Sequence, residues 1–235
     1  TSRWLVEHRP LFQLPEIPAL TTLVELTEET GEIANLQVRN NAAPAVVLLA
    51  RPPRPNPRQV LVLVAVNLTE RAKPAAAGVI LEHARAGATI VVDDPDPAAW
   101  WRVPGLKKAK TEDDRVTYTL GAGKVIAYNE RIADPSEFAL DSIDFVGQGN
   151  RAVRLWAAPT VLARAVVTRR GAAMIAVNYG QPVDVEIQSR IRGVYRSATL
   201  IRPDGAPLKL KTAKRGFTTE VQIPELRKLG VVLFE

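Results

Sequence analysis

The stretch that decides the fold is residues 79–94, VILEHARAGATIVVDD, which passes from a helical pattern through a glycine into an unbroken apolar run. Apolar side chains recur at helical spacing over residues 75–86, and Gly87 is a residue type that commonly ends helices. Residues 90–92 show no polar alternation, which is typical of a strand covered on both faces. The stretch therefore predicts a helix followed directly by a buried strand.

A second apolar run lies upstream, over residues 60–66, and predicts another buried strand. Thr69 fits the N-cap of the intervening helix, and Pro74 is tolerated in its first turns. Strand, helix and strand within about 33 residues form a βαβ unit, whose crossover is expected to be right-handed. Further short strands are predicted at residues 46–49, 116–120 and 124–128.

The second half of the chain has a different periodicity. Apolar and polar residues alternate over residues 183–188 and 217–223, which is typical of half-buried antiparallel strands. Turn residues separate such runs at intervals of about 8 to 12 residues. These features predict a small β-sandwich of about six strands.

This change of periodicity places a domain boundary near residues 147–150, GQGN. We expect an α/β domain over residues 46–150 and a β-sandwich over residues 151–235. Residues 1–45 are expected to form an N-terminal segment that packs on either domain.

Within that segment, two apolar runs at residues 23–26 and 33–38 flank the turn-like tetrad at residues 28–31, EETG. This pattern favours a β-hairpin, with a short helix as the alternative.

The composition restricts the class of protein. With 46% apolar and 24% charged residues, the 235-residue chain has the composition of a folded protein, and no apolar run reaches the roughly 20 residues needed to span a bilayer. The absence of cysteine excludes disulfides, a thiol nucleophile and Cys-ligated zinc. The net charge of +6 raises the question of nucleic acid, but the basic residues of 188–215 follow the pattern of a solvated strand face, so nucleic acid is not favoured.

The chain begins Thr1-Ser2-Arg3-Trp4, without an initiator Met or a charged-then-apolar leader. A leader or a longer preceding region is therefore expected to have been removed, which is compatible with a secreted or periplasmic protein. No cofactor is expected, because Gly121-Ala122-Gly123 lacks the third glycine of a dinucleotide fingerprint and does not open a helix.

Two parts of the sequence resemble parts of large carbohydrate-active enzymes. The segment EHARAGATIVVDD, residues 82–94, resembles a helix-to-strand segment of class I glutamine amidotransferase-like domains, in particular the non-catalytic trimerisation-domain type found beside the barrel of some β-galactosidases. The strand at residues 121–126, GAGKVI, is similar to the one that closes that domain. The run MIAVNY, residues 174–179, resembles the strand that opens the C-terminal β-sandwich of large glycoside hydrolases.

The resemblance implies a fold class of α/β plus all-β: a flavodoxin-like or amidotransferase-like parallel sheet followed by an antiparallel β-sandwich. It does not imply glutamine hydrolysis, which in that family requires a cysteine nucleophile and a histidine base. The chain has no cysteine, His83 lies on the predicted helix, and His8 lies in the N-terminal segment. For His83 a structural role is favoured.

The candidate binding site is the run VVDDPDPAAWW, which follows a predicted strand end, where ligands of open parallel sheets gather. Carboxylates there accept hydrogen bonds from sugar hydroxyls, and indoles offer flat apolar faces to sugar rings. The candidate residues are Asp93, Asp94, Asp96, Trp100, Trp101 and, after the neighbouring strand, Asn67. The competing interpretation, which is favoured, is an acidic loop anchored by tryptophan.

Other chemistries are not favoured. A glycosidase needs two carboxyl groups about 5 or 6.5–9.5 Å apart, whereas the side chains of adjacent residues such as Asp93 and Asp94 diverge. With Asp96 these residues resemble part of a calcium loop, but the required Gly and terminal Glu are absent, so no metal is expected. Residues 107–114, KKAKTEDD, are expected to form a solvated loop.

The sequence therefore favours a non-catalytic accessory region of a carbohydrate-active protein, serving carbohydrate contact or assembly of a homo-oligomer. One alternative is a glycoside hydrolase that uses the strand-end carboxylates Asp93 and Asp94. Another is a basic module that binds nucleic acid or an anionic surface.

Overall fold

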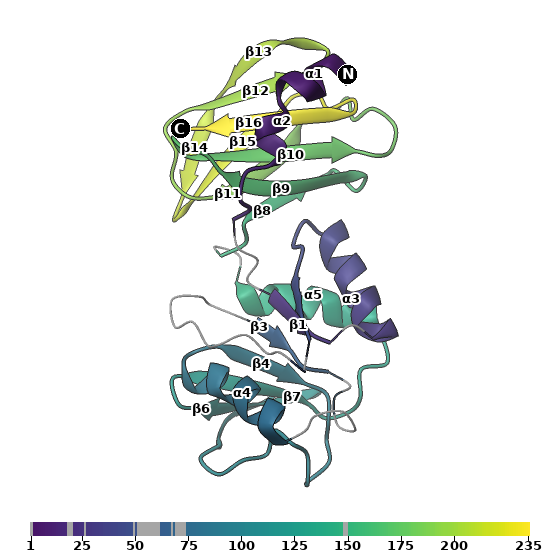
Figure 1. The fold of residues 1–235 in the computed structure, drawn as a ribbon, viewed down its shortest axis with the longest axis vertical. Coiled ribbons are helices and arrows are strands. Elements are labelled where there is room, and N and C mark those ends of the chain that lie inside the picture. The colour runs from purple at the N-terminus through teal and green to yellow at the C-terminus, as the bar shows by residue number, and fades with distance from the viewer. Residues whose placement is uncertain are drawn as a thin grey trace. The chain divides into compact units, whose positions relative to one another are not determined.

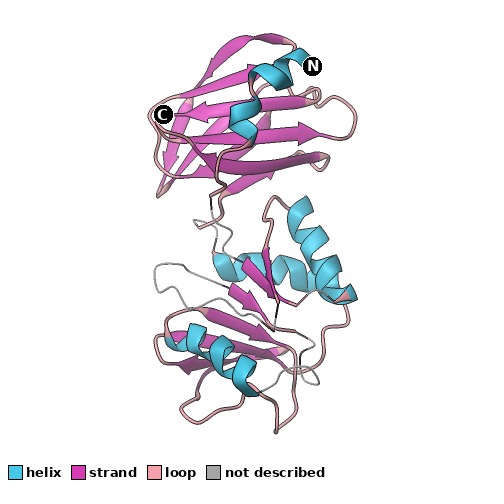
Figure 2. Ribbon diagram, viewed as in Figure 1, coloured by secondary structure: helices cyan, strands magenta, loops and turns pink. Residues whose placement is uncertain are grey.

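The chain forms two compact units in the computed structural model (Figure 1). Unit 1 comprises residues 1–18, 38–43 and 148–235, and unit 2 comprises residues 19–37 and 44–147. Strands predominate over helices, and the C-terminal region is antiparallel (Figure 2). In this coarse form, the expected mixture of α/β and all-β structure is confirmed. The structure describes residues 2–17, 21–25, 27–48, 50, 62–66, 68, 74–147 and 150–235.

Unit 2 is built on a seven-stranded sheet in the order β2, β1, β3, β4, β7, β6, β5. The strands that run parallel are β1 (Thr21–Val24), β2 (Ala45–Val47), β3 (Val62–Val64), β4 (Thr89–Val92) and β7 (Gly123–Tyr128). The sheet continues antiparallel through β6 (Arg115–Leu120) and β5 (Lys107–Thr111). Strands β3 and β4 are buried along their whole length, as the unbroken apolar runs predict.

Helices cover both faces of this sheet. Ile33 of α3 (Glu28–Arg39) and Phe138 of α5 (Pro135–Val146) belong to one core cluster, together with Val62 and Val64 of β3. Leu63 points to the other face, where it joins a second cluster that includes residues of α4 (Pro74–Arg85). Unit 2 therefore has three layers, with α3 and α5 on one face and α4 on the other (Figure 1).

The hairpin expected in the N-terminal segment is wrong. Residues 33–38 lie in α3, and β1 pairs in parallel with β2 and β3. The N–H of Thr30 donates to Thr27 Oγ1 at 3.2 Å, and the carboxylates of Glu28 and Glu29 lie in the first turn, where they favour a helix. The tetrad EETG therefore forms the first turn of a helix.

Helix α5 is missing from the elements predicted from the sequence, although its start carries clear local signals. Asp134 is the N-cap, and its carboxylate accepts a hydrogen bond from the Ser136 N–H at 2.7 Å. Pro135 follows at the first helical position, where its missing N–H costs nothing.

The glycines of the GAG turn allow β6 and β7 to approach α4. Gly121 has a φ of 61°, and a Cβ there would collide with the backbone of Arg85. A Cβ on Gly123 would collide with the carbonyl oxygens of Ala84 and Ala88. The adjacent Lys124 N–H donates to the Ala88 carbonyl at 3.1 Å. The motif therefore has a packing role at this turn.

Unit 1 is a β-sandwich of nine strands, more than the six expected, and all of its strand pairs are antiparallel. The five-stranded sheet has the order β13 (Gly205–Leu210), β12 (Ala198–Arg202), β16 (Leu229–Phe234), β10 (Ala172–Asn178), β9 (Val161–Val167). The four-stranded sheet has the order β14 (Thr212–Arg215), β15 (Thr218–Ile223), β11 (Ile187–Arg192), β8 (Val153–Trp156). Their facing side chains form one core, which includes Met174, Ile191, Leu200 and Phe234.

Two details of the expected alternation are wrong. Strand β11 begins only at Ile187, while Val183 makes an isolated bridge to Leu226 and Val185 is 55% exposed. Phe217 was expected on the inner face of a strand, but it lies in the turn before β15 and is 85% exposed.

Residues 2–17, which we call the N-terminal strap, belong to unit 1. They include α1 (Ser2–Glu7) and α2 (Arg9–Phe12), and residues 15–17 pair with β9. Apolar side chains of the strap cover a cluster on the five-stranded sheet outside the sandwich core, which consists of Val166, Ala173, Ile175, Leu229 and Val231. The packed strap side chains are Trp4, Leu11, Phe12 and Leu14.

Candidate functional site

The predicted site residues lie in the loop that follows β4, at the carboxyl edge of the parallel strands. Asp93 and Asp94 come directly after the buried strand and are themselves buried, with 5% and 4% of their surfaces exposed. Asp96 is exposed, and Trp100 is partly buried. Asn67 lies outside the described residues.

Trp101 anchors this loop to the core. Its side chain is completely buried, and its ring lies 5.6 Å from that of Tyr118, measured between centroids. The indole Nε1–H donates to the backbone carbonyl of Asp94 at 2.9 Å. Because neither ring face reaches solvent, Trp101 offers no platform for a sugar ring.

The two buried carboxylates hold different segments of backbone. Asp94 Oδ1 accepts a hydrogen bond from the Asp96 N–H at 3.1 Å, which fixes the turn that follows. Asp93 Oδ2 accepts from the N–H of Ile132 at 3.4 Å, in the connection between β7 and α5. Although they are adjacent in sequence, one carboxylate fixes the turn after β4 and the other holds the connection between β7 and α5.

Arg102 is part of this site, although the sequence analysis did not identify it. Its Nε–H donates to the Asp96 carbonyl at 2.9 Å, and a second nitrogen donates to the Pro95 carbonyl at 3.3 Å. The guanidinium carbon lies 4.3 Å from the centroid of the Trp101 ring, within the range of a cation–π contact. No spacing in the sequence signals this role, because it depends on how the loop folds back.

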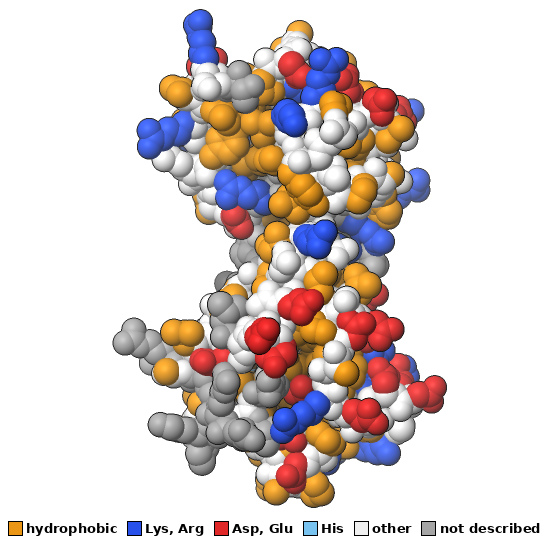
Figure 3. Space-filling view, turned by 90° about the vertical axis from the view of Figure 1, so that its right-hand side faces the viewer, with side chains coloured by type: hydrophobic (Ala, Val, Ile, Leu, Met, Phe, Trp, Pro, Cys, Tyr) orange, Lys and Arg blue, Asp and Glu red, His pale blue; other side chains and the backbone are white. Residues whose placement is uncertain are grey.

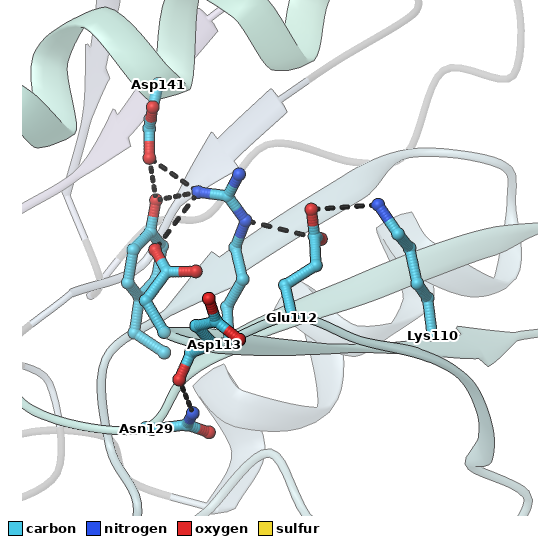
Figure 4. A network of polar contacts seen from close by, with 8 residues as sticks. Lys110, Glu112, Asp113, Asn129 and Asp141 are labelled. Carbon is cyan, nitrogen blue, oxygen red and sulfur yellow. Dashed lines mark hydrogen bonds and ion pairs between the residues drawn. The ribbon is translucent and has the colours of Figure 1, made fainter.

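A second polar cluster joins β6, β7 and α5 (Figure 4). A guanidinium nitrogen of Arg115 donates to Asp141 Oδ2 at 2.6 Å, and the Tyr128 hydroxyl donates to the same oxygen at 2.7 Å. Burial and the hydrogen bond to Asp141 raise the pKa of Tyr128 above its usual value. Burial alone would lower the pKa of Arg115, but its contacts with Tyr128 and Asp141 raise it. The cluster holds a neutral phenol and a fixed cation beside one carboxylate.

The stretch KKAKTEDD, expected to be a solvated loop, is only partly irregular. Residues 107–111 form β5, the edge strand of the sheet, and every one of them is exposed. Glu112 accepts from Lys110 at 2.8 Å and pairs with Arg115 at 3.4 Å (Figure 4). These contacts, led by the hydrogen bond from Lys110, lower the pKa of the Glu112 carboxyl. Lysines on an edge strand discourage pairing with another sheet.

Each of the two histidines is packed against other parts of the protein. His83 is 2% exposed within α4. His8 stacks on Trp4 of the strap with ring centroids 4.1 Å apart, and its Nδ1 lies 2.9 Å from the Trp4 carbonyl oxygen. Among the described residues, no group of three His, Asp or Glu side chains is arranged to hold a metal ion.

Asn178 in unit 1, from the MIAVNY motif, is a buried hydrogen-bonding centre. Its amide nitrogen lies within hydrogen-bonding distance of three backbone carbonyls, those of Gln181, Leu226 and Arg227. Its amide oxygen accepts from Thr160 Oγ1 at 2.8 Å and from the Gly180 N–H at 2.9 Å. The motif therefore ties three connections together at one end of the sandwich: those between β8 and β9, between β10 and β11, and between β15 and β16.

The described helices include none long and apolar enough to cross a membrane. The sequence matches no protein family model, and it matches no curated protein.

Several solved glycoside hydrolase chains have a similar fold at low sequence identity. An α-L-fucosidase isoenzyme 2 from Paenibacillus thiaminolyticus aligns with a TM-score of 0.67 and 8% identity, over 98% of this chain and 50% of the fucosidase chain. A β-galactosidase from Bacillus circulans sp. alkalophilus aligns with a TM-score of 0.56 and 10% identity, over 91% of this chain and 41% of that one. A rhamnosidase from Novosphingobium sp. PP1Y aligns with a TM-score of 0.60 and 17% identity, over 92% of this chain and 22% of the rhamnosidase chain. The chain spans half or less of these proteins and has a fold that forms part of each of them.

Proposed function

We propose that this chain is a non-catalytic accessory region of a carbohydrate-active, glycoside-hydrolase-like protein. The observation that carries the proposal is the fucosidase alignment, because 98% of this chain, including both units, corresponds to half of one glycoside hydrolase chain. If the similarity reflected only one common fold, the alignment would cover one unit and not both. The proposal places this pair of units beside a catalytic part.

The finer assignment is an amidotransferase-like, flavodoxin-like fold for unit 2 and a glycoside-hydrolase-type sandwich for unit 1. The α/β bounds expected from the sequence, residues 46–150, leave out β1 and most of α3, which belong to unit 2. The support for this assignment is the order of the parallel strands, β2, β1, β3, β4, β7, which corresponds to the flavodoxin-like order 2-1-3-4-5. The non-catalytic character is supported by the sequence, which contains no cysteine for amidotransferase chemistry.

Within this proposal, carbohydrate contact falls to the exposed part of the loop after β4. Trp100 and Asp96 retain solvent-accessible surface. Trp101 and Asp94 are buried, and the Trp101 indole N–H donates to the Asp94 backbone carbonyl. Assembly of a homo-oligomer is the second role the accessory region would serve. The hydrolase alternative is disfavoured because Asp93 and Asp94 each accept a hydrogen bond from a backbone N–H.

Calorimetric titration with fucosides, galactosides and rhamnosides tests the carbohydrate role, and light scattering measures the oligomeric state. We expect sugar binding that Trp100→Ala abolishes, while Trp156→Ala in unit 1 serves as the matched control and leaves it unchanged. A strictly monomeric chain that binds none of these sugars would remove both roles. Hydrolysis of an aryl glycoside that Asp93→Asn or Asp94→Asn abolishes would instead establish the hydrolase.

A further inference from the structure

The two units carry opposite net charge. Unit 1 contains 18 Lys and Arg against 8 Asp and Glu, whereas unit 2 contains 13 against 17. On the face shown in Figure 3, acidic side chains gather on unit 2. The basic excess of the protein is therefore a property of the sandwich unit.

Within unit 1 the pairing of strands brings much of this excess to one end of the sandwich. Ala172 and Ala198 both pair with Phe234, so the β9–β10 turn, the start of β12 and the C-terminus share that end. The Arg196 N–H donates to the Glu235 carbonyl at 2.7 Å, and the Thr212 hydroxyl donates to the Arg196 carbonyl at 3.3 Å. These bonds join the end of the five-stranded sheet to β14.

We call this surface the basic end and define it by its exposed cations, Arg169, Arg170, Arg196, Lys211, Lys214 and Arg215. Arg170 lies 3.7 Å from Glu235, and Arg215 lies 3.2 Å from Glu220. The other four have no acidic partner among the described residues. At the opposite end of the sandwich the charges compensate, since Arg227 pairs with Glu225 at 2.6 Å and Arg202 lies 3.9 Å from the same carboxylate.

Two exposed apolar side chains stand among these cations. Phe217, in the β14–β15 turn after Gly216, is 85% exposed, and Val194 is 51% exposed. Their backbone segments adjoin, because the Gly193 N–H donates to the Phe217 carbonyl at 2.9 Å. Gly216 has a φ of 60°, a conformation that L side chains rarely adopt, so the turn is built to hold this protruding shape.

We propose that the basic end binds the surface of an anionic lipid membrane, with Phe217 inserted among the lipid headgroups. The cations come from three separate connections and from the exposed strand β14, an arrangement that suits a flat charged surface better than a single linear chain. A sulfated polysaccharide in solution would be recognised by the cations alone and would leave Phe217 exposed without a role. Basic residues beside an inserted aromatic side chain are the combination that holds peripheral proteins at anionic bilayers.

The test is co-sedimentation of the full chain with vesicles of phosphatidylcholine alone and of phosphatidylcholine mixed with phosphatidylglycerol. We expect binding to the mixed vesicles only, weakened by added salt. Phe217→Ser is expected to weaken binding about tenfold or more, because the apolar side chain no longer inserts. Lys211→Gln combined with Lys214→Gln is expected to weaken it about fivefold for each lysine.

Matched controls separate these effects from folding and from overall charge. Val185→Ser removes an exposed apolar side chain at the opposite end, and Lys107→Gln with Lys108→Gln removes two exposed lysines from unit 2. Both should bind mixed vesicles as the unchanged protein does. Failure of the unchanged protein to bind mixed vesicles would overturn the proposal. Binding to heparin that Phe217→Ser leaves intact, without vesicle binding, would also overturn it and assign the basic end to soluble polyanions.

Discussion

At the residue scale, Trp101 has two structural roles, one in packing and one in hydrogen bonding. Its ring fills the core between the sheet and the loop after β4, and its indole N–H satisfies the buried carbonyl of Asp94. A buried carbonyl that loses its partner costs free energy, so the side chain fixes the loop as well as filling space.

Trp101→Phe tests this role. The ring remains apolar, but the hydrogen bond to Asp94 is lost, so the free energy of unfolding of unit 2 should fall by about 1–3 kcal/mol. Urea unfolding measures the change. Trp100→Phe, at the adjacent and more exposed position, is the control and should change stability by much less. Equal effects of the two substitutions would show that the hydrogen bond contributes nothing special.

Gly123 tests close packing at the same scale. An Ala side chain there would overlap the backbone carbonyls of Ala84 and Ala88, and we expect a loss of about 1–3 kcal/mol. Gly78→Ala lies within α4 with nothing within 4 Å of the added Cβ, and should instead stabilise by about 0.5–1 kcal/mol. Thermal unfolding of both variants checks the opposite signs. A tolerated Gly123→Ala would contradict the packing role of the GAG turn.

At the scale of the element, the four-stranded sheet brings two arginines together and compensates their charges with neighbouring side chains. Arg154 and Arg190 face each other on β8 and β11, a pairing that repels when uncompensated. Trp156 lies within 4.6 Å and 5.0 Å of their guanidinium carbons, measured to the ring centroid, and Glu220 binds Arg190 at 2.5 Å. Glu220 is 8% exposed and also pairs with Arg215 at 3.2 Å, so one carboxylate compensates two arginines.

The hydrogen bond from Arg190 is the largest cause that lowers the pKa of Glu220, and Arg215 adds to it. A carboxyl whose pKa is lowered by folding stabilises the protein above its unfolded pKa, and the contribution is lost as the pH falls through the folded pKa. Glu220→Gln should therefore destabilise β11 and β15 at pH 7 and make less difference at about pH 3. Hydrogen exchange of the amides in these strands measures the loss of stability at both pH values. Glu186→Gln, at an exposed position, is the control, and a pH-independent effect of Glu220→Gln would contradict the argument.

At the scale of the whole molecule, the chain passes more than once between its two units. The strap joins unit 1, residues 19–37 join unit 2, residues 38–43 return to unit 1, and residues 44–147 form the rest of unit 2. Each unit therefore depends on segments that are distant in sequence. The strap shows this most directly, because it covers an apolar face of the five-stranded sheet.

Leu11→Ser combined with Phe12→Ser should uncover that face and lower the free energy of unfolding of unit 1 by about 1–3 kcal/mol. Binding of a dye that reports exposed apolar surface should rise at the same time. Leu5→Ser combined with Val6→Ser changes two exposed strap residues and should have little effect. If both pairs behave alike, the strap does not protect the sheet.

Local patterns predicted the buried strands β3 and β4, the helix between them, the β6–β7 turn and the antiparallel second half. They failed where the local signal was ambiguous or unused. The tetrad EETG fits both a turn and a helix start. The hydrogen bond to Thr27 and the acidic first turn favour the helix, and the burial of Ile33 against the sheet adds to this preference. Helix α5 has local start signals at Asp134 and Pro135, although the predicted elements do not include this helix.

The candidate site divides in the same way. The sequence placed Asp93, Asp94 and the tryptophans at a strand end, and they lie there. It did not indicate that Trp101 turns inward, or that Arg102 covers its ring. The cluster of Arg115, Tyr128 and Asp141 and the basic end also depend on partners that are far apart along the chain.

The sequence by itself determined the type of each unit, because the period of apolar residues decides between a covered parallel strand and a half-exposed antiparallel one. Only the tertiary structure decided which polar side chains support the backbone and which face solvent. That choice depends on the other segments that surround each side chain, and residues adjacent in sequence, such as Trp100 and Trp101, meet different surroundings.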